Sequence, residues 1–219
     1  MKKPMLSLLV ILSVGNALAQ VKPAVKKPVS GIGVKIGNQI WMKKNLDVST
    51  YRNGDPIPNV TDTAAWNTLT MGAYCYYNND SATYAAVYGK LYNWYAVNDP
   101  RGLAPVGWHV ASDKEWLTIG DLLGGDKVAG RRMKEKGHAH WVGSDSSATN
   151  SSGFTALPGG FRLGHNNFSG VGSLGFWWTS TPTELEGGGI FRNLSSSGNK
   201  LDGEGIEGNY FYSVRCMKD

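Results

Sequence analysis

The side chains best suited to recognising a polar ligand lie in one glycine-rich loop region between residues 162 and 178. It offers a guanidinium, an imidazole, two amides and two indole rings, from Arg162, His165, Asn166, Asn167, Trp177 and Trp178. Guanidinium and amide groups hydrogen-bond to hydroxyls and carbonyls, and aromatic faces stack on apolar surfaces. Such a set suits sugars or polar protein epitopes. The alternative is that these residues only brace the loops.

The Trp177–Trp178 pair carries a prediction about orientation. Neighbouring residues of a strand face opposite sides of a sheet. We therefore expect one of the two indoles to pack in the core and the other to lie nearer to solvent.

Metal-binding patterns are weak in this chain. His138 and His140 would share one face of a strand and suit zinc, but no third ligand follows at a fixed spacing. Oxygen ligands for calcium occur together at Asp202, Glu204, Glu207 and Asn209, but their spacing fits no EF-hand. We interpret the first pair as solvated or core histidines and the second group as an acidic turn, and expect no metal and no cofactor.

Catalytic motifs are equally weak. The chain contains no G-x-S-x-G segment, which a serine nucleophile on a strand-to-helix turn would require. Two G-x-G-x-x-G matches, at 170–175 and 203–208, do not lie between a strand and a helix and indicate glycine-rich loops. Paired carboxylates for glycoside cleavage meet only in space, so the sequence does not test for them. We expect no catalytic residue.

The elements that position these residues are clearest around Pro105–Gly124. A buried strand end at 107–110 precedes a helix expected over 113–123, with Ser112 as N-cap and Glu115 completing a capping box. Gly124 supplies the left-handed position that ends the helix. His109, Ser112, Asp113 and Glu115 resemble a catalytic set when taken alone, but Ser112 and Glu115 are better explained as capping groups.

The remaining pattern predicts an α+β fold. A hairpin is expected over 34–42 around Gly37-Asn38, a strand over 73–77, a helix over 83–97 and a shorter helix around 127–135. Strands are then expected over 153–161, 176–179, 190–194 with a partner near Leu201, and 210–217. Helices in the first half and strands in the second are typical of α+β proteins.

The N-terminal residues and the distribution of charge indicate where the protein acts and which ligands it does not bind. Residues 1–19 read as a signal peptide, residues 20–30 as a Lys/Pro linker, and residues 31–219 as a single domain. Five lysines precede residue 31, and without them the chain has 17 basic and 17 acidic residues. The folded part therefore lacks the basic face that nucleic acid needs. We expect export to the cell surface or outside, with the periplasm as the alternative, and no transmembrane segment.

The two cysteines, Cys75 and Cys216, lie far apart in sequence. In an oxidising compartment a structural disulfide is the default interpretation, and two buried free thiols are the alternative.

Six segments follow one another along the chain: GAYCYYNND (72–80), YGKLYNWYAV (88–97), GWHV (107–110), GFTALPGGFR (153–162), WWTST (177–181) and SVRC (213–216). Together they resemble the Fibrobacter succinogenes major paralogous domain, found in secreted and surface proteins of Bacteroidetes and Fibrobacteres. The resemblance implies a C-type lectin-like fold, shared with the formylglycine-generating enzymes. That fold has two main helices, a small curved antiparallel sheet, adjacent terminal strands and long loops.

One position departs from this resemblance. The family usually has a cysteine where this chain has Ala104, so Cys216 would have to pair with Cys75 instead. That pairing requires Cα atoms within about 7 Å.

These observations predict a secreted or cell-surface recognition module that is not an enzyme and that binds a glycan or another surface protein; its oligomeric state is left open. The alternatives are a divergent enzyme of the same superfamily, oxidase-like or polysaccharide-active, and a purely structural extracellular scaffold.

Overall fold

The computed structural model describes residues 33–62, 69–143, 147–163 and 167–219. The signal peptide and linker expected over residues 1–30 therefore lie outside the described residues. Within that part of the chain most regular structure is β, arranged in one sheet of four strands and one of eight.

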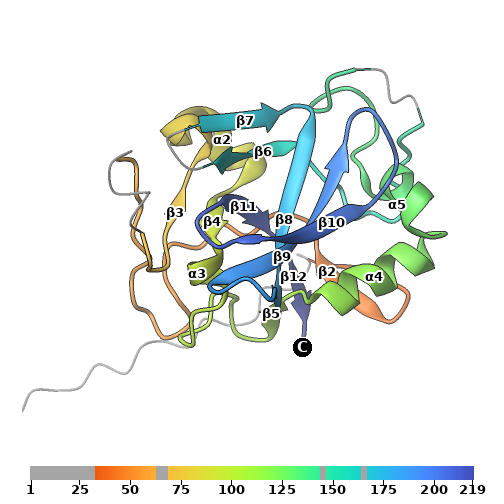
Figure 1. Ribbon diagram of the computed structural model, residues 1–219. Helices are drawn as coiled ribbons and strands as arrows, with labels where there is room; N and C mark the ends of the chain where they lie inside the picture. The colour runs from red at the N-terminus through yellow and green to blue at the C-terminus, as the bar shows by residue number, and fades with distance from the viewer. Residues whose placement is uncertain (1–32, 63–68, 144–146, 164–166) are drawn as a thin grey trace, which may run out of the picture.

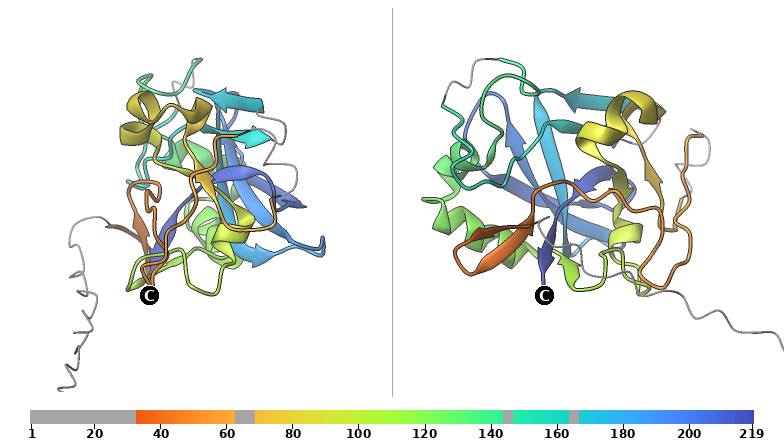
Figure 2. Two further views of the ribbon diagram at one scale, coloured as in Figure 1. Left: turned by 90° about the vertical axis from the view of Figure 1, so that its left-hand side faces the viewer. Right: turned by 180° about the vertical axis from the view of Figure 1, so that it is seen from behind.

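The four-stranded sheet joins the two ends of the described chain. Its strands, in spatial order, are β1 (Gly33–Ile36), β2 (Gln39–Met42), β12 (Cys216–Lys218) and β5 (Trp108–Val110). Trp41 of β2 is paired with Met217 of β12, so the N-terminal hairpin lies next to the last strand through its second strand, as the expected adjacency of terminal strands requires. Seen from behind, the β1–β2 hairpin lies beside β12 near the C-terminus (Figure 2).

The eight-stranded sheet forms the larger part of the molecule. Its path is β10 (Asp202–Glu207), β9 (Gly188–Ser195), β8 (Leu174–Pro182), β6 (Gly159–Leu163), β11 (Phe211–Val214), β4 (Leu91–Asn93) and β3 (Tyr74–Cys75), and β7 (Asn167–Val171) pairs with β6. β11 and β6 each pair with β8 in parallel, and the other pairings are antiparallel.

The helices of the described residues are short. They are α2 (Ser81–Tyr88), α3 (Trp94–Val97), α4 (Asp113–Leu122) and α5 (Asp126–Met133), with a 3-10 turn, η1, at Tyr77–Asn79. Figure 1 shows β8 running through the middle of the molecule, with α4 and α5 together on one side and α2, β3 and β4 on the other.

The expected C-type lectin-like α+β fold is therefore wrong. Instead of two main helices and one small curved antiparallel sheet, the described chain has two sheets, parallel pairings within the larger one, and four short helices.

The segment 83–97 explains much of this error, because its apolar spacing predicts one helix. Gly89 has a φ of +71°, which ends α2 after Tyr88. The next residues then form β4, where Tyr92 pairs with Tyr74 on one side and Tyr212 on the other. Pairing with two neighbouring strands outweighs the helical periodicity of a short apolar run.

Elements with their own local signals were predicted correctly. α4 begins after Ser112, whose hydroxyl accepts from the Glu115 N–H while the Glu115 carboxylate accepts from the Ser112 N–H at 2.7 Å, which confirms the capping box. Gly124 has a φ of +97°, as expected of the residue that follows a helix end. The hairpin around Gly37, the short helix α5 and the β9–β10 hairpin are also confirmed.

The core lies on both faces of β8. Trp177 belongs to a cluster with Trp41, Trp116 and Phe154, whose ring centroids lie 5.0 to 6.4 Å apart. Trp178 belongs to a second cluster, on the opposite face of the same strand. The alternation of side chains along one strand thus connects two parts of the core.

A buried arginine holds the two sheets together. Arg215 lies between β11 and β12, and its guanidinium donates to the carbonyls of Met42 and Phe154, both at 2.8 Å, and to the Asn45 side-chain oxygen at 2.9 Å. The guanidinium carbon also lies over the ring of Phe154, 4.3 Å from its centroid. Burial lowers the pKa of Arg215 to about 9.

The expected disulfide is wrong, because both cysteines are free and buried. Cys75 is in β3 of the larger sheet and Cys216 is in β12 of the smaller one, and they belong to different core clusters. Burial raises the pKa of both thiols, that of Cys216 to about 12. Protonated, buried thiols behave as small apolar side chains.

Replacing Arg215 by lysine should destabilise the protein strongly. The lysine retains the charge but leaves carbonyl acceptors of Met42 and Phe154 without their donor, so a loss of about 3–5 kcal/mol is expected. Urea unfolding followed by tryptophan fluorescence measures it. Arg101→Lys is the matched control; it alters an exposed arginine with surface ion pairs, and should cost less than about 1 kcal/mol. Equal losses in the two variants would contradict the role of Arg215.

The cysteines should react with Ellman's reagent only after unfolding. Their buried, protonated state predicts no reaction in the native protein over minutes and two thiols per chain in guanidinium chloride without reductant. Absence of reactive thiols in the denatured protein would show that a disulfide forms after all.

Candidate functional site

One face of the β8–β9–β10 ribbon carries a row of side chains suited to a polar ligand. Phe176 of β8 is paired with Asn193 of β9, and Asn193 with Asp202 of β10, so the three side chains lie across the strands on the same face. The next row on that face is Trp178, Phe191 and Glu204. In both rows the residue on β10 is an exposed carboxylate.

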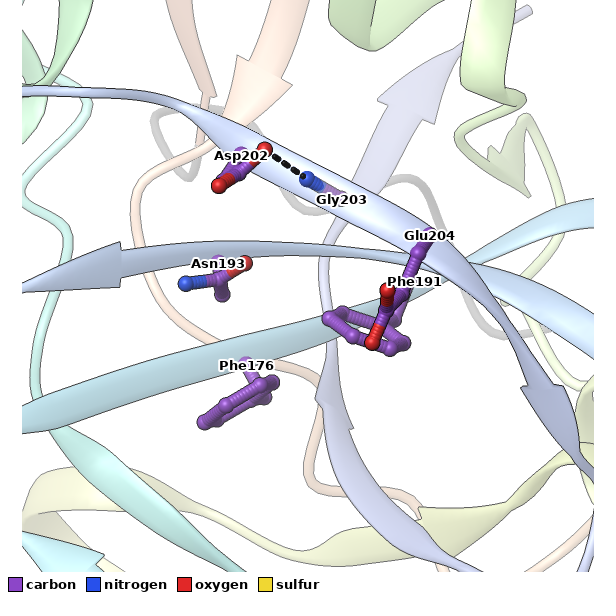
Figure 3. Close-up of a pocket in the computed structure, with 6 residues that line it drawn as sticks. All are labelled: Phe176, Phe191, Asn193, Asp202, Gly203 and Glu204. Atoms are coloured by element: carbon purple, nitrogen blue, oxygen red, sulfur yellow. Dashed lines mark hydrogen bonds between the residues drawn. The ribbon is translucent and has the colours of Figure 1, made fainter.

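These rows surround a shallow pocket of about 260 Å³. Its lining residues are Phe176, Phe191, Asn193, Asp202, Gly203 and Glu204. Figure 3 shows the phenyl rings of Phe176 and Phe191 below Asp202 in this view, with Asn193 to their left and Glu204 next to the Phe191 label. Gly203 belongs to the other face of β10, where a Cβ would meet the carbonyl oxygen of Phe191, so glycine allows β10 to lie close to β9.

An aromatic cluster forms the floor of this pocket. Tyr212 of β11 is buried and stacks on Phe176, with centroids 5.0 Å apart and an 18° angle between the planes. Phe161 and Phe191 pack against Phe176 at 4.8 and 5.3 Å. Phe161, Phe176 and the neighbouring Tyr210 are only half-buried. The outer rings are therefore held in place by the inner ones and present apolar faces to solvent.

The polar groups of the pocket are mainly hydrogen-bond acceptors. Asp202 accepts from the Lys200 ammonium, at 2.9 Å, and from the N–H of Gly203, at 3.1 Å. The hydrogen bond from Lys200 and the Gly203 N–H hold the pKa of Asp202 below its usual value, so the carboxylate stays ionised at neutral pH. With Glu204 and the amide of Asn193, it can accept hydrogen bonds from hydroxyl or amine groups.

These carboxylates do not form a calcium cluster with Glu207. Asp202 and Glu204 share one face of β10, and Glu207 belongs to the other. Among the described residues, no group of three or more His, Cys, Asp or Glu side chains is placed to hold a metal ion.

The described members of the set predicted from the sequence, Arg162, Asn167, Trp177 and Trp178, do not form one site. Arg162 is wholly buried against the ring of Phe168, 5.1 Å from its centroid, and burial lowers its pKa to about 10. Asn167 is exposed at the start of β7. His165 and Asn166 lie outside the described residues.

The two tryptophans are both buried, so the expectation that one lies nearer to solvent is wrong. The Trp177 indole N–H donates to the Asn45 side chain and that of Trp178 to the Tyr92 carbonyl, each at 2.9 Å. Both N–H groups are therefore satisfied inside the protein. In this structure neither indole is available to a ligand at the surface.

Sequence reasoning missed Phe176, Asn193, Asp202 and Glu204 as members of one site. A signal was present on β10, where Asp202, Glu204 and Ile206 alternate with glycines. Alternation with a period of two predicts that one face of the strand carries side chains and that the other carries mainly glycines. The pairing with Phe176, however, depends on the sheet register.

A second group of titratable residues surrounds His109 of β5. Its Nδ1 lies 2.8 Å from the Asp219 carboxylate and its Nε2 lies 3.0 Å from Glu115. Glu115 also accepts from the Ser112 hydroxyl at 2.8 Å. Because the Ser112 hydroxyl donates to a carboxylate and not to the imidazole, it is not arranged as a nucleophile activated by His109. The group ties the C-terminal residue to the start of α4.

The His109 group gives stability a pH dependence. Burial lowers the pKa of His109, but the hydrogen bonds to Asp219 and Glu115 outweigh burial and raise it above 6.5. Burial raises the pKa of Glu115, but hydrogen bonds from Ser112 and His109 outweigh burial and lower it below 4.5. The His109 contribution is thus complete below about pH 6.5 and lost as pH rises through the raised pKa. The Glu115 contribution is complete above about pH 4.5 and lost as pH falls through the lowered pKa.

His109→Gln should therefore destabilise the protein more at pH 5.5 than at pH 9. Glutamine can hydrogen-bond but cannot carry the charge that the two carboxylates stabilise. Urea unfolding of both proteins at the two pH values measures the difference. The same loss of unfolding free energy at both pH values would show that the charge of His109 contributes nothing.

None of the helices among the described residues has both the length and the apolar character needed to cross a bilayer.

Comparison with curated proteins finds no match, and comparison with solved structures finds none either. The family model of the Fibrobacter succinogenes major domain matches residues 34–218, which is nearly the whole described chain. This chain is therefore a member of the Fibrobacter succinogenes major domain family.

Proposed function

We propose that this protein is an exported, non-enzymatic recognition module that binds a glycan in the pocket between Phe176 and the β10 carboxylates. The observation that carries the proposal is one row across three strands, in which a half-buried phenyl ring, an amide and a carboxylate face the same side. Support for export comes from the signal-peptide pattern of residues 1–19.

The aromatic floor favours a sugar over a charged small molecule. The C–H face of a pyranose ring is apolar and flat, and it packs on an aromatic face much as another ring would. Phe176 is fixed by stacking on Tyr212 and by contact with Phe161, so it loses little side-chain freedom on binding. A preorganised platform of this kind gives affinity at low entropic cost.

The polar rim favours the hydroxyls of the same sugar. Asp202 and Glu204 accept hydrogen bonds only, and Asn193 both donates and accepts, so together they match the mixed donors and acceptors of adjacent hydroxyl groups. Hydrogen bonds to charged groups are the stronger kind. The two carboxylates also disfavour acidic sugars, so we expect neutral or amino sugars to bind best.

The size of the pocket favours a glycan over a folded protein partner at this position. A volume of about 260 Å³ lies just below the usual range for small-molecule sites, and suits one sugar unit of a longer chain. Stable protein interfaces bury more than about 1,000 Å².

A glycan array with the labelled protein should identify the ligand, and calorimetry with that glycan should measure its affinity. Phe176→Ala and Glu204→Gln should each weaken binding about tenfold, which corresponds to about 1.4 kcal/mol for the lost stacking or the lost charged acceptor. Circular dichroism checks that both variants remain folded.

Tyr84→Ala is the matched control, because Tyr84 is also a half-buried aromatic residue but lies on α2, outside the pocket. It should leave the affinity unchanged. The proposal fails if no glycan on the array binds the wild-type protein, or if Phe176→Ala binds as tightly as wild type.

A further inference from the structure

A second pocket, of about 490 Å³, lies at the C-terminal end of α5. Its lining residues are Val128, Arg131, Arg132, Ser147, Thr149, Ser151 and Asn199. Two guanidiniums, three hydroxyls and an amide therefore border one cavity, and no carboxylate is among the lining groups that the structure describes. This composition is the opposite of that of the β10 pocket.

The loop that carries the hydroxyls is tied to the last turn of α5. The Arg131 carbonyl accepts from the N–H of Thr149, at 2.8 Å, and the Arg132 carbonyl accepts from the hydroxyl of Ser152, at 2.7 Å. These bonds satisfy carbonyls that a helix end leaves without partners. They also fix the hydroxyl-bearing loop against the two arginines.

A hydrogen bond positions the guanidinium of Arg131. The Nε of Arg131 donates to the Ser147 carbonyl at 2.9 Å, which orients the terminal N–H groups of the same guanidinium. The Arg132 guanidinium lies beside the backbone of Gly124, where a Cβ would stand 3.4 Å from Nη1. Glycine at this position leaves room for the arginine.

The two charges have no ionic partner within the described part of the chain, since neither Arg131 nor Arg132 forms an ion pair with any residue there. The helix dipole favours basic residues in the last turn of α5. The dipole does not, however, account for two guanidiniums converging with hydroxyl groups on one cavity. Like charges in one pocket repel, and a bound anion would remove that repulsion.

We propose that this pocket binds the oxyanion group of a polar ligand: a phosphate ester, a sulfate ester or a carboxylate. Guanidiniums donate two parallel hydrogen bonds to such groups, and serine hydroxyls add further donors. The volume exceeds that of a bare anion and lies within the range of small-molecule sites, so the anion is carried on a larger molecule such as an acidic sugar. This site is independent of the glycan pocket.

Titrations followed by amide chemical shifts test the proposal, with glucose 6-phosphate, glucose 6-sulfate, glucuronate and glucose as separate probes at constant ionic strength. At least one anionic probe should shift the amides of Val128, Thr149 and Ser151, and glucose should not. The probe that binds tightest identifies the oxyanion. Shifts spread over the surface, or equal shifts with glucose, would overturn the proposal.

Variants decide which residues carry the charge. Arg131→Gln and Arg132→Gln should each weaken binding of the best probe at least tenfold. Lys127→Gln is the matched control; it removes one positive charge from the same helix but does not line the pocket, and should change affinity less than twofold. Equal weakening in all three variants would show that only the net charge of the helix matters, and would overturn the proposal of a specific site. If Arg131→Gln does not fold, Arg132→Gln and the wild-type shift map still decide.

The same proteins separate this proposal from the glycan pocket. Phe176→Ala should bind the anionic probe as wild type does, and Arg132→Gln should bind the array glycan as wild type does. If the anion binds but no glycan does, the anion-site proposal holds and the glycan proposal fails. If a glycan binds but no anion does, only the anion-site proposal fails.

Discussion

The guanidinium of Arg215 is the interaction on which the rest of the structure depends. It is fully buried where the chain leaves the eight-stranded sheet at β11 and enters the four-stranded sheet at β12. Moving a cation out of water costs several kcal/mol, and no described residue forms an ion pair with it. Carbonyl dipoles of Met42 and Phe154 and the ring of Phe154 offset that cost. The charge is tolerated only if both segments are in place.

The candidate glycan pocket depends on this buried centre. Asn45 accepts from Arg215 and also from the indole N–H of Trp177, so the same amide oxygen that orients the arginine fixes β8. Side chains on β8 alternate, and with Trp177 anchored on one face, Phe176 and Trp178 must face the other. Tyr212, three residues before Arg215, then stacks on Phe176. A surface ring is thus placed by a hydrogen bond in the core.

The sequence predicted correctly the elements that depend on neighbouring residues, and gave wrong predictions where strands far apart in the chain pair with one another. Ser112 and Glu115 form their capping hydrogen bonds within one helical turn, and Gly37 lies in the turn between two adjacent strands. Both features could therefore be predicted from a few neighbouring residues. The segment from Leu91 to Asn93 is a strand because it pairs with β3 on one side and, on the other, with Phe211 and Tyr212, over a hundred residues later. The supposed disulfide failed for the same reason, since the assignment of β3 and β12 to different sheets has no local signature.

The β9–β10 hairpin contributes residues to both candidate pockets, although the pockets differ in their chemistry. Asn193 and Asp202 line the first pocket, and Asn199, between them in sequence, lines the second. The connection is held to α5, since the Asn199 carbonyl accepts from the N–H of Gly130 and the ammonium of Lys134 donates to the Gly198 carbonyl. The equal numbers of acidic and basic residues over 31–219 therefore do not mean an even charge distribution, because one pocket is acidic and the other is basic. The position of each charge in the fold decides which ligands each pocket can accept.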